Sequence, residues 1–287
     1  MSRVRTVVAT EVMLFLGLLA FVIAAFLVER GAGLDGPVAL GPIARIAFAA
    51  APSMLWLGYF RAQDSQMPEP MSLLWVMYLA GALVAGPVAS FAVEVALPPD
   101  AAATPVFARF GSERLITAFL VVAMAQELCK YAVVRYTVYS LPDLGDPVDG
   151  LVYMTAVGLG FATFRSHQYL SELDGEVLLS VAAGRVVVTT LAHACFAAVL
   201  GLAIGWAKFW SRTPGRRSLV LLAGLLGAVL LNGQFALVEA AISVPGLSFA
   251  PWRSVAFAFG FAAAVLIAFS FVLRRVVRAV ARVESEA

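Results

Sequence analysis

The residues best suited to chemistry are Glu127 and Lys130, which lie inside an apolar stretch from about 115 to 139. A spacing of three places both side chains on one face of a helix. The stretch is long enough to span a bilayer, and ionisable groups at that depth usually face a bundle interior or a wet cavity. Two interpretations are open: a structural ion pair that holds helices together, or a site where a carboxylate handles a proton or a water molecule.

The composition is that of a polytopic membrane protein. Of the 287 residues, 62% are hydrophobic and 13% are charged, and the mean hydropathy is +0.91. A soluble domain carries roughly 25% charged residues. We expect one all-α transmembrane domain over residues 1–287, with the lipid bilayer as its surroundings. The net charge of +2 gives no indication of a nucleic-acid partner. Cys129 and Cys195 both fall in predicted spans, so no disulfide framework is expected.

Hydrophobic runs predict about eight spans, at residues 7–28, 38–60, 72–97, 114–139, 149–171, 177–207, 218–243 and 253–277. Basic residues such as Arg3, Arg216 and Arg275 lie before the first span, between the sixth and seventh, and after the eighth. The positive-inside rule therefore places both termini in the cytoplasm. The first apolar run is too long for the core of a cleaved signal and is interpreted as a span. We expect a multi-pass protein of the cell membrane, specifically the bacterial inner membrane.

Polar residues inside the predicted spans concentrate on the fourth to the seventh, so the motif-bearing core is expected at about 114–243. The full set is Glu11, Arg45, Glu94, Gln126, Glu127, Lys130, Arg165, His167, Gln168, Arg185, His193, Asn232, Gln234 and Glu239. The helical rise places Glu127, His193 and Asn232 near mid-membrane, and Arg165 on the order of 10 Å further out. A lone histidine in a bundle is more often a packing residue than a ligand or base, and a small transporter would show similar buried charges.

A second acidic cluster, Asp146-Pro147-Val148-Asp149-Gly150, precedes the fifth predicted span. Asp146 can serve as the N-cap, Pro147 as the first helical residue and Asp149 as a first-turn acid. Helix capping explains this cluster without any catalytic role.

Four short segments on consecutive spans form an ordered pattern. They are Gln126-Glu127-Leu128-Cys129-Lys130, Gly160-Phe161-Ala162-Thr163-Phe164-Arg165-Ser166, His193 and Asn232-Gly233. Their order and spacing resemble the PrsW family of intramembrane endopeptidases, which is distantly similar to the CAAX prenyl endopeptidases. The family pattern is Glu-Glu-x-x-Lys, then Gly-Phe-Ala and, two residues later, Glu-Asn, then a His and commonly another His. The resemblance covers roughly residues 45 to 240.

The resemblance carries family roles over to Glu127, Lys130 and His193 as catalytic residues, with Phe161 as a packing match. Four positions depart from the pattern: Gln126 and Arg165 replace glutamates, Ser166 replaces an asparagine and Asn232 replaces a histidine. A permanent positive charge at 165 repels a divalent cation. Glu127 and His193 alone fall short of the three protein ligands that a catalytic zinc site usually has. Counting His167 as a third ligand would still leave the ligand set facing Arg165. We therefore predict no catalytic metal, no cofactor and substoichiometric zinc.

The resemblance implies regulated proteolysis of a single-span or membrane-anchored protein, for example of the anti-sigma type. In this interpretation Glu127 is the general base on a water, His193 stabilises the oxyanion or donates a proton, and Lys130 keeps Glu127 ionised. Because three of the charged or ligating motif positions have changed, impaired activity is expected. The alternatives are an inactive pseudoprotease that binds membrane helices and, more distantly, a small transporter.

Arg165 is also expected to need an anionic partner in a low dielectric. The acids at a suitable depth are Glu127, Glu94 and Glu239.

Overall fold

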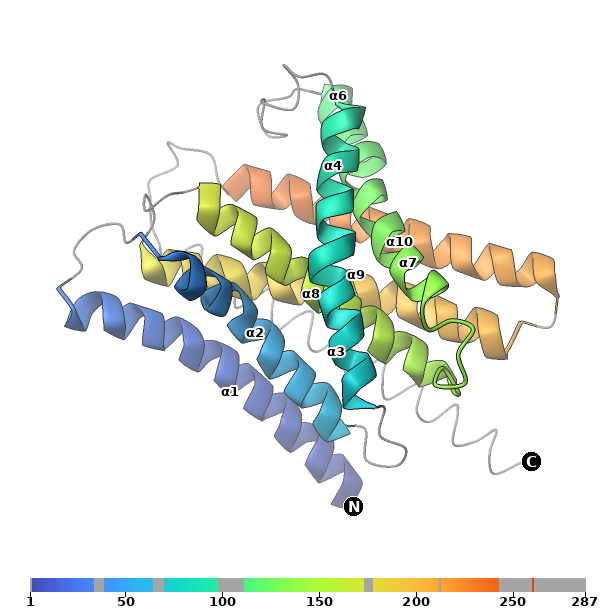
Figure 1. Ribbon diagram of the computed structural model, residues 1–287, viewed down its shortest axis with the longest axis horizontal. Coiled ribbons are helices and arrows are strands. Elements are labelled where there is room, and N and C mark those ends of the chain that lie inside the picture. Colours follow the sequence, from blue (N-terminus) through green and yellow to red (C-terminus); the bar gives the residue numbers. More distant parts are fainter. Residues whose placement is uncertain are drawn as a thin grey trace.

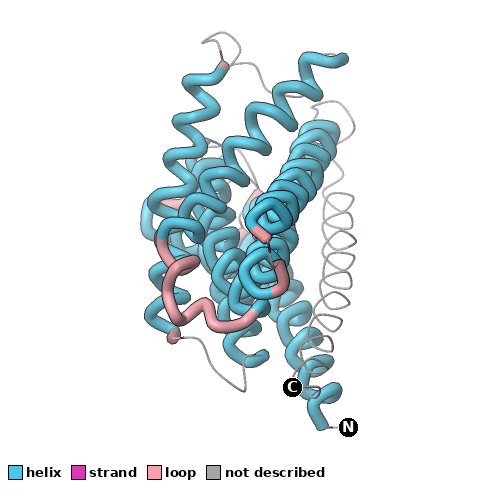
Figure 2. Tube along the Cα trace, turned by 90° about the vertical axis from the view of Figure 1, so that its right-hand side faces the viewer, coloured by secondary structure: helices cyan, strands magenta, loops and turns pink. Residues whose placement is uncertain are grey.

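The computed structural model describes residues 2–33, 39–63, 70–97, 111–172, 178–211, 213–242 and 260, and all regular structure in these ranges is helical (Figure 2). The α-helices are α1 (Ser2–Gly31), α2 (Pro42–Gln63), α3 (Met71–Ala80), α4 (Gly86–Ala96), α6 (Gly111–Ile116), α7 (Met124–Tyr136), α8 (Pro147–Glu172), α9 (Leu179–Phe209) and α10 (Pro214–Ile242). Two π-helical segments, η1 (Gly81–Ala85) and η3 (Thr117–Ala123), join α3 to α4 and α6 to α7. Seven predicted spans are therefore helices, with ends that differ by a few residues.

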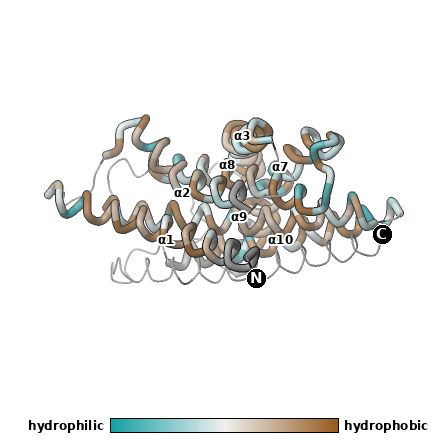
Figure 3. The backbone as a smooth tube through the Cα atoms, turned by 90° about the horizontal axis from the view of Figure 1, so that it is seen from below, coloured by the Kyte–Doolittle hydropathy of each residue, from teal (hydrophilic) through white to brown (hydrophobic). Residues whose placement is uncertain are grey.

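Six of the described helical stretches are long and apolar enough to cross a membrane: 12–31, 71–96, 117–136, 147–172, 179–209 and 214–237. Large apolar side chains such as Leu83, Phe91 and Leu120 point outward on these helices, and Figure 3 shows hydrophobic residues along most of the tube. The prediction of an all-helical membrane bundle is confirmed. Helix α2 is not among the six, and the predicted eighth span lies outside the described residues, so the count of eight and the side of the termini stay predictions.

Helix α8 is the central element of the bundle. It packs against α9, α2, α7 and the continuous helix formed by α3, η1 and α4, which crosses it steeply in Figure 1. All residues from 150 to 163 are buried, as expected for a helix that is apolar on every side. Helix α9 in turn packs against α10 and α1.

Glycines bring the backbones around α8 into direct contact. A Cβ added at Gly160 would overlap the carbonyl of Tyr78 on α3, and one at Gly81 would overlap the carbonyl of Val157. On the opposite side of α8, a Cβ at Gly158 would lie 2.8 Å from the carbonyl oxygen of His193. Small residues permit this close approach of helices inside a membrane.

Replacing Gly160 with alanine is expected to lower the thermal unfolding midpoint by about 5 °C, because the methyl group must push α3 away from α8. The measurement is thermal unfolding of the purified full chain in detergent. The matched control is Gly58→Ala on α2, where an added Cβ meets nothing within 4 Å. Equal midpoints for the two variants would contradict this account of the α3–α8 contact.

The acidic cluster before α8 is a cap, as the sequence indicates. Oδ2 of Asp149 accepts hydrogen bonds of 2.7 Å from the backbone nitrogens of both Gly145 and Asp146. Oδ1 of Asp146 accepts from the backbone nitrogens of Val148 and Asp149. Both carboxylates therefore satisfy backbone donors at the start of the helix.

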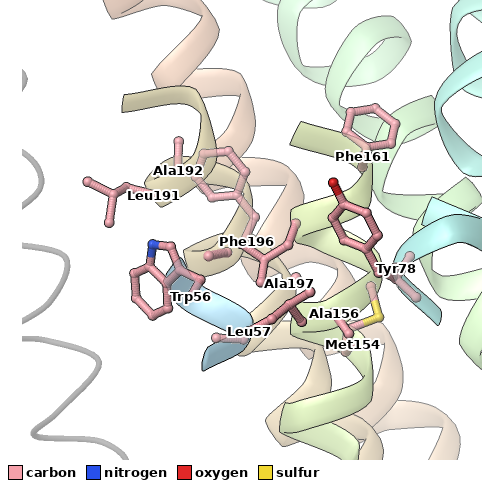
Figure 4. Close-up of a cluster of buried hydrophobic side chains, with 14 of the residues drawn as sticks. Trp56, Leu57, Tyr78, Met154, Ala156, Phe161, Leu191, Ala192, Phe196 and Ala197 are labelled. Carbon is pink, nitrogen blue, oxygen red and sulfur yellow. The ribbon is translucent and has the colours of Figure 1, made fainter. Parts of the chain in front are cut away.

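The apolar core lies where α2, α3, α8 and α9 meet. It includes Trp56, Tyr78, Phe161 and Phe196, which Figure 4 labels together with smaller neighbours. Phe161 and Phe196 lie on α8 and α9, and their rings also border the ammonium group of Lys130. The core therefore supplies two walls of the candidate site.

Candidate active site

The candidate site is centred on an ion pair with no exposure to solvent. Nζ of Lys130 lies 2.6 Å from Oε1 of Glu127, and both side chains are 0% exposed. The two residues stand on the first two turns of α7, just after the π-helical segment η3. Their shared helix face agrees with the spacing seen in the sequence. Segments with π-helical geometry are found frequently at functional sites.

Lys130 also reaches His193 on α9, so three predicted residues come together. Its Nζ lies 3.5 Å from Nδ1 of His193. It also lies 5.1 Å from the ring centre of Phe161 and 5.8 Å from that of Phe196. A carboxylate, an imidazole nitrogen and two aromatic faces therefore surround the ammonium group. Such contacts compensate in part for removing a charge from water.

The contact with Lys130 fixes the tautomer of a neutral His193. An ammonium group donates hydrogen bonds and cannot accept them, so Nδ1 is the acceptor and the ring proton lies on Nε2. The ring stands edge-on to Phe161 and Phe196, with centroids 4.9 and 5.5 Å apart. His193 therefore offers one N–H donor from a ring held by two aromatic neighbours.

Two of the substituted motif positions belong to the same cluster. Nδ2 of Asn232 on α10 donates to Oε1 of Glu127 at 2.7 Å and to Oε1 of Gln126 at 3.0 Å. The sequence placed Asn232 at the depth of Glu127 but gave no sign of these bonds. The role of Phe196 was also missed, although it lies three residues after His193 and so shares its face of α9.

The two carboxylate oxygens of Glu127 have different surroundings. Oε1 accepts from Lys130 and Asn232. Oε2 is buried and has no hydrogen-bond partner among the described residues. A buried acceptor without a partner is unusual and costly, and such groups often have a functional explanation. Glu127 is thus held through one oxygen and available for a ligand through the other.

Of the three acids proposed as partners of Arg165, Glu127 is not bonded to it. Nη1 of Arg165 donates to Oε1 of Gln168 at 2.8 Å, one turn along α8. Glu94 is exposed, and the side chain of Glu239 lies outside what the structure describes. The guanidinium is only half-buried, which explains why a neutral amide partner is tolerated. Ser166 is 2% exposed, and its Oγ has no partner among the described residues.

Because Arg165 contacts a neutral amide, Arg165→Gln is expected to change the unfolding midpoint by no more than about 2 °C. Arg165→Glu is expected to behave similarly. Thermal unfolding of both variants beside the wild type measures this. A loss of about 10 °C in either variant would show that Arg165 has a buried anionic partner after all.

A bundle of apolar helices that buries a carboxylate and a lysine on α7 beside a histidine on α9 is the type of fold found in intramembrane proteases. Residues 69–248 match the model of the PrsW family intramembrane metalloprotease, and the chain belongs to this family. It is therefore a multi-pass protein of the cell membrane.

Named relatives support the same assignment. The chain is 31% identical to a Protease PrsW from Geobacillus kaustophilus (strain HTA426) over 190 residues, which are 66% of this chain and 77% of the relative. It is 27% identical to a Protease PrsW from Shouchella clausii (strain KSM-K16), covering 67% and 82% of the two chains. It is 24% identical to a Protease PrsW from Bacillus subtilis (strain 168), and the match covers 69% of this chain and 84% of the relative. No solved structure matches the chain.

The family description implies a metal ion, and the residues of this site do not fit one. Within the described part of the chain, no group of three or more His, Cys, Asp or Glu side chains is arranged to hold a metal. Oε1 of Glu127 and Nδ1 of His193 both face the ammonium of Lys130. Gln126 and Asn232 contribute neutral amides, which are poor ligands for zinc.

Proposed function

We propose that this chain is an intramembrane peptidase with reduced activity, which acts on single-span or membrane-anchored proteins. The observation that carries the proposal is the difference in hydrogen bonding between the two carboxylate oxygens of Glu127. Oε1 is held by Lys130 and Asn232, whereas Oε2 is buried and has no partner among the described residues. A general base needs such a fixed carboxylate with one oxygen within reach of its proton donor.

In the proposed reaction, Oε2 of Glu127 removes a proton from a water molecule as the water oxygen bonds to the carbonyl carbon of the peptide. The Nε2–H group of His193 donates a hydrogen bond to the oxyanion that forms. Glu127 then passes the proton to the leaving nitrogen as the C–N bond breaks. Lys130 balances the charge of Glu127 while it is ionised.

We expect reduced activity because the side chains of this site do not make up a set of metal ligands. A metal ion polarises the carbonyl and lowers the pKa of a bound water, and no step here has that assistance. A positioned base and one oxyanion donor accelerate the reaction less than the same two groups assisted by a metal ion.

Binding without cleavage is the second candidate function. It is favoured by Gln126 and Asn232, which are bonded within the site and cannot act as acids, bases or strong ligands. In that case the family fold binds a membrane helix and leaves the helix intact.

The experiment that separates these functions is co-reconstitution of the full chain with tagged single-span reporters of the anti-sigma type in liposomes. Fragments that form with the wild type but not with Glu127→Gln support a peptidase. Reporters that co-purify with both proteins and are never cut support the pseudoprotease. Reporters that neither bind nor break would contradict both.

We also expect purified protein to hold well under one zinc ion per chain, and any cleavage to persist in the presence of a chelator. Elemental analysis of the purified chain and a chelator titration measure this. One tightly held metal ion per chain that is lost in His193→Ala would contradict the prediction.

A further inference from the structure

Two substituted motif positions on different helices, Gln126 on α7 and Asn232 on α10, are bonded to each other. One nitrogen, Nδ2 of Asn232, lies 3.0 Å from Oε1 of Gln126 and 2.7 Å from Oε1 of Glu127. The side chains of Gln126 and Asn232 are only 7% and 2% exposed. The two hydrogens of one amide nitrogen therefore serve oxygens of two successive residues across a helix interface.

We propose that Gln126 and Asn232, here called the amide pair, are positioning residues that hold Glu127 in the absence of a bound metal. This inference rests on the proposed function, since it takes Glu127 as the reacting carboxylate. Asn232 and Lys130 both donate to Oε1 of Glu127, and Gln126 holds Asn232 in place by accepting from the same nitrogen, which leaves Oε2 to face a substrate water. The pair thus fixes which oxygen of Glu127 reacts.

The chemistry of the pair explains why the two substitutions belong together. A glutamate at 126 beside Asn232 would add a second carboxylate next to Glu127, which raises the cost of burying negative charge. A histidine at 232 beside Gln126 would replace an amide nitrogen that donates two hydrogen bonds with a neutral ring that donates only one. When both residues are amides, the hydrogen bond across the interface is kept and neither group titrates.

Arg165 makes no hydrogen bond to the amide pair, since its guanidinium is bonded to Gln168, although its charge acts on His193. The groups that hold Glu127 by hydrogen bonds are therefore the amide pair and the ammonium of Lys130.

The first test is a double-mutant cycle on thermal unfolding of the full chain in detergent. Asn232→Ala is expected to lower the midpoint by about 5 °C, since two hydrogen bonds are lost, one of them to a charged group. Adding Gln126→Ala should lower it little further, because its bond is already gone. Gln234→Ala, an exposed amide on the same helix, is the matched control. Additive losses for the two single variants would overturn the coupling.

The second test introduces a carboxylate at position 126 and an imidazole at position 232, so that both side chains stay polar. The double variant Gln126→Glu with Asn232→His is expected to take up about one zinc ion per chain and to unfold at a higher temperature with zinc than without it. The wild type, each single variant and the control Gln234→His should hold far less. Stoichiometric zinc in the wild type or a single variant, or none in the double variant, overturns the proposal.

The third test separates positioning from mere stability. In the reporter assay, Asn232→Ala is expected to lower kcat at least about tenfold with KM unchanged, since binding of the reporter does not involve Asn232. Equal kcat values would overturn the positioning role. If the wild type cuts no reporter, the proposed function fails, and the unfolding and zinc measurements still decide whether the amide pair is the unit that excludes metal.

Discussion

Glu127→Gln is expected to reduce reporter cleavage by about 10²–10⁴-fold, which is the usual contribution of a positioned general base. Glutamine keeps the size and the acceptor oxygen of glutamate, so it can still accept from Lys130, but it cannot take up a proton. The measurement is the initial rate of fragment formation in liposomes that contain purified chain and reporter.

The matched control is Glu94→Gln on α4, a glutamate that also lies within a spanning helix but is exposed. It should retain the wild-type rate. Wild-type cleavage by Glu127→Gln, or an equal loss in Glu94→Gln, would rule out Glu127 as the base. The unfolding midpoint of each variant shows whether a lost rate reflects a lost fold.

Lys130→Met is expected to destabilise the bundle by about 3–5 kcal/mol, because it leaves a fully buried carboxylate without its cation. Methionine matches the length of the lysine side chain, so the loss reports on charge more than on volume. For a chain of this size the midpoint should fall by roughly 10 °C. The wild-type pair has a separation of 2.6 Å and no exposure to solvent, so bulk water does not screen the carboxylate when its cation is removed.

The double variant Lys130→Met with Glu127→Leu provides the control for this prediction. Removing both charges avoids the uncompensated carboxylate, and such replacements of buried pairs are often neutral. The double variant should therefore recover most of the stability lost by Lys130→Met. If the double variant is as unstable as the single one, packing around Lys130, and not its charge, stabilises the site.

These two predictions also bear on the two interpretations of the pair that the sequence left open. The geometry supports a structural role, since Lys130 contacts residues of α7, α8 and α9. It equally supports a chemical role, since one oxygen of Glu127 has no partner among the described residues. The stability of Lys130→Met measures the first role, and the cleavage rate of Glu127→Gln measures the second.

The sequence by itself determined the helices and their class. Seven apolar runs became helices with ends close to those predicted, because a backbone in lipid must satisfy its hydrogen bonds within its own segment. The caps at Asp146 and Asp149 and the shared face of Glu127 and Lys130 could be predicted from local helix geometry. All of these features depend on residues no more than four apart in the chain.

Only the tertiary structure decided which residues of different helices meet. Asn232 bonds to Glu127 across 105 positions of sequence, whereas Arg165, for which Glu127 was one of three candidate partners, is bonded to Gln168. Depth along a helix can be counted from the sequence, but rotation about its axis depends on packing against neighbours. Here the glycine contacts around α8 and the π-helical turns of η1 and η3 accompany that packing. Which groups surround Glu127 follows from those rotations.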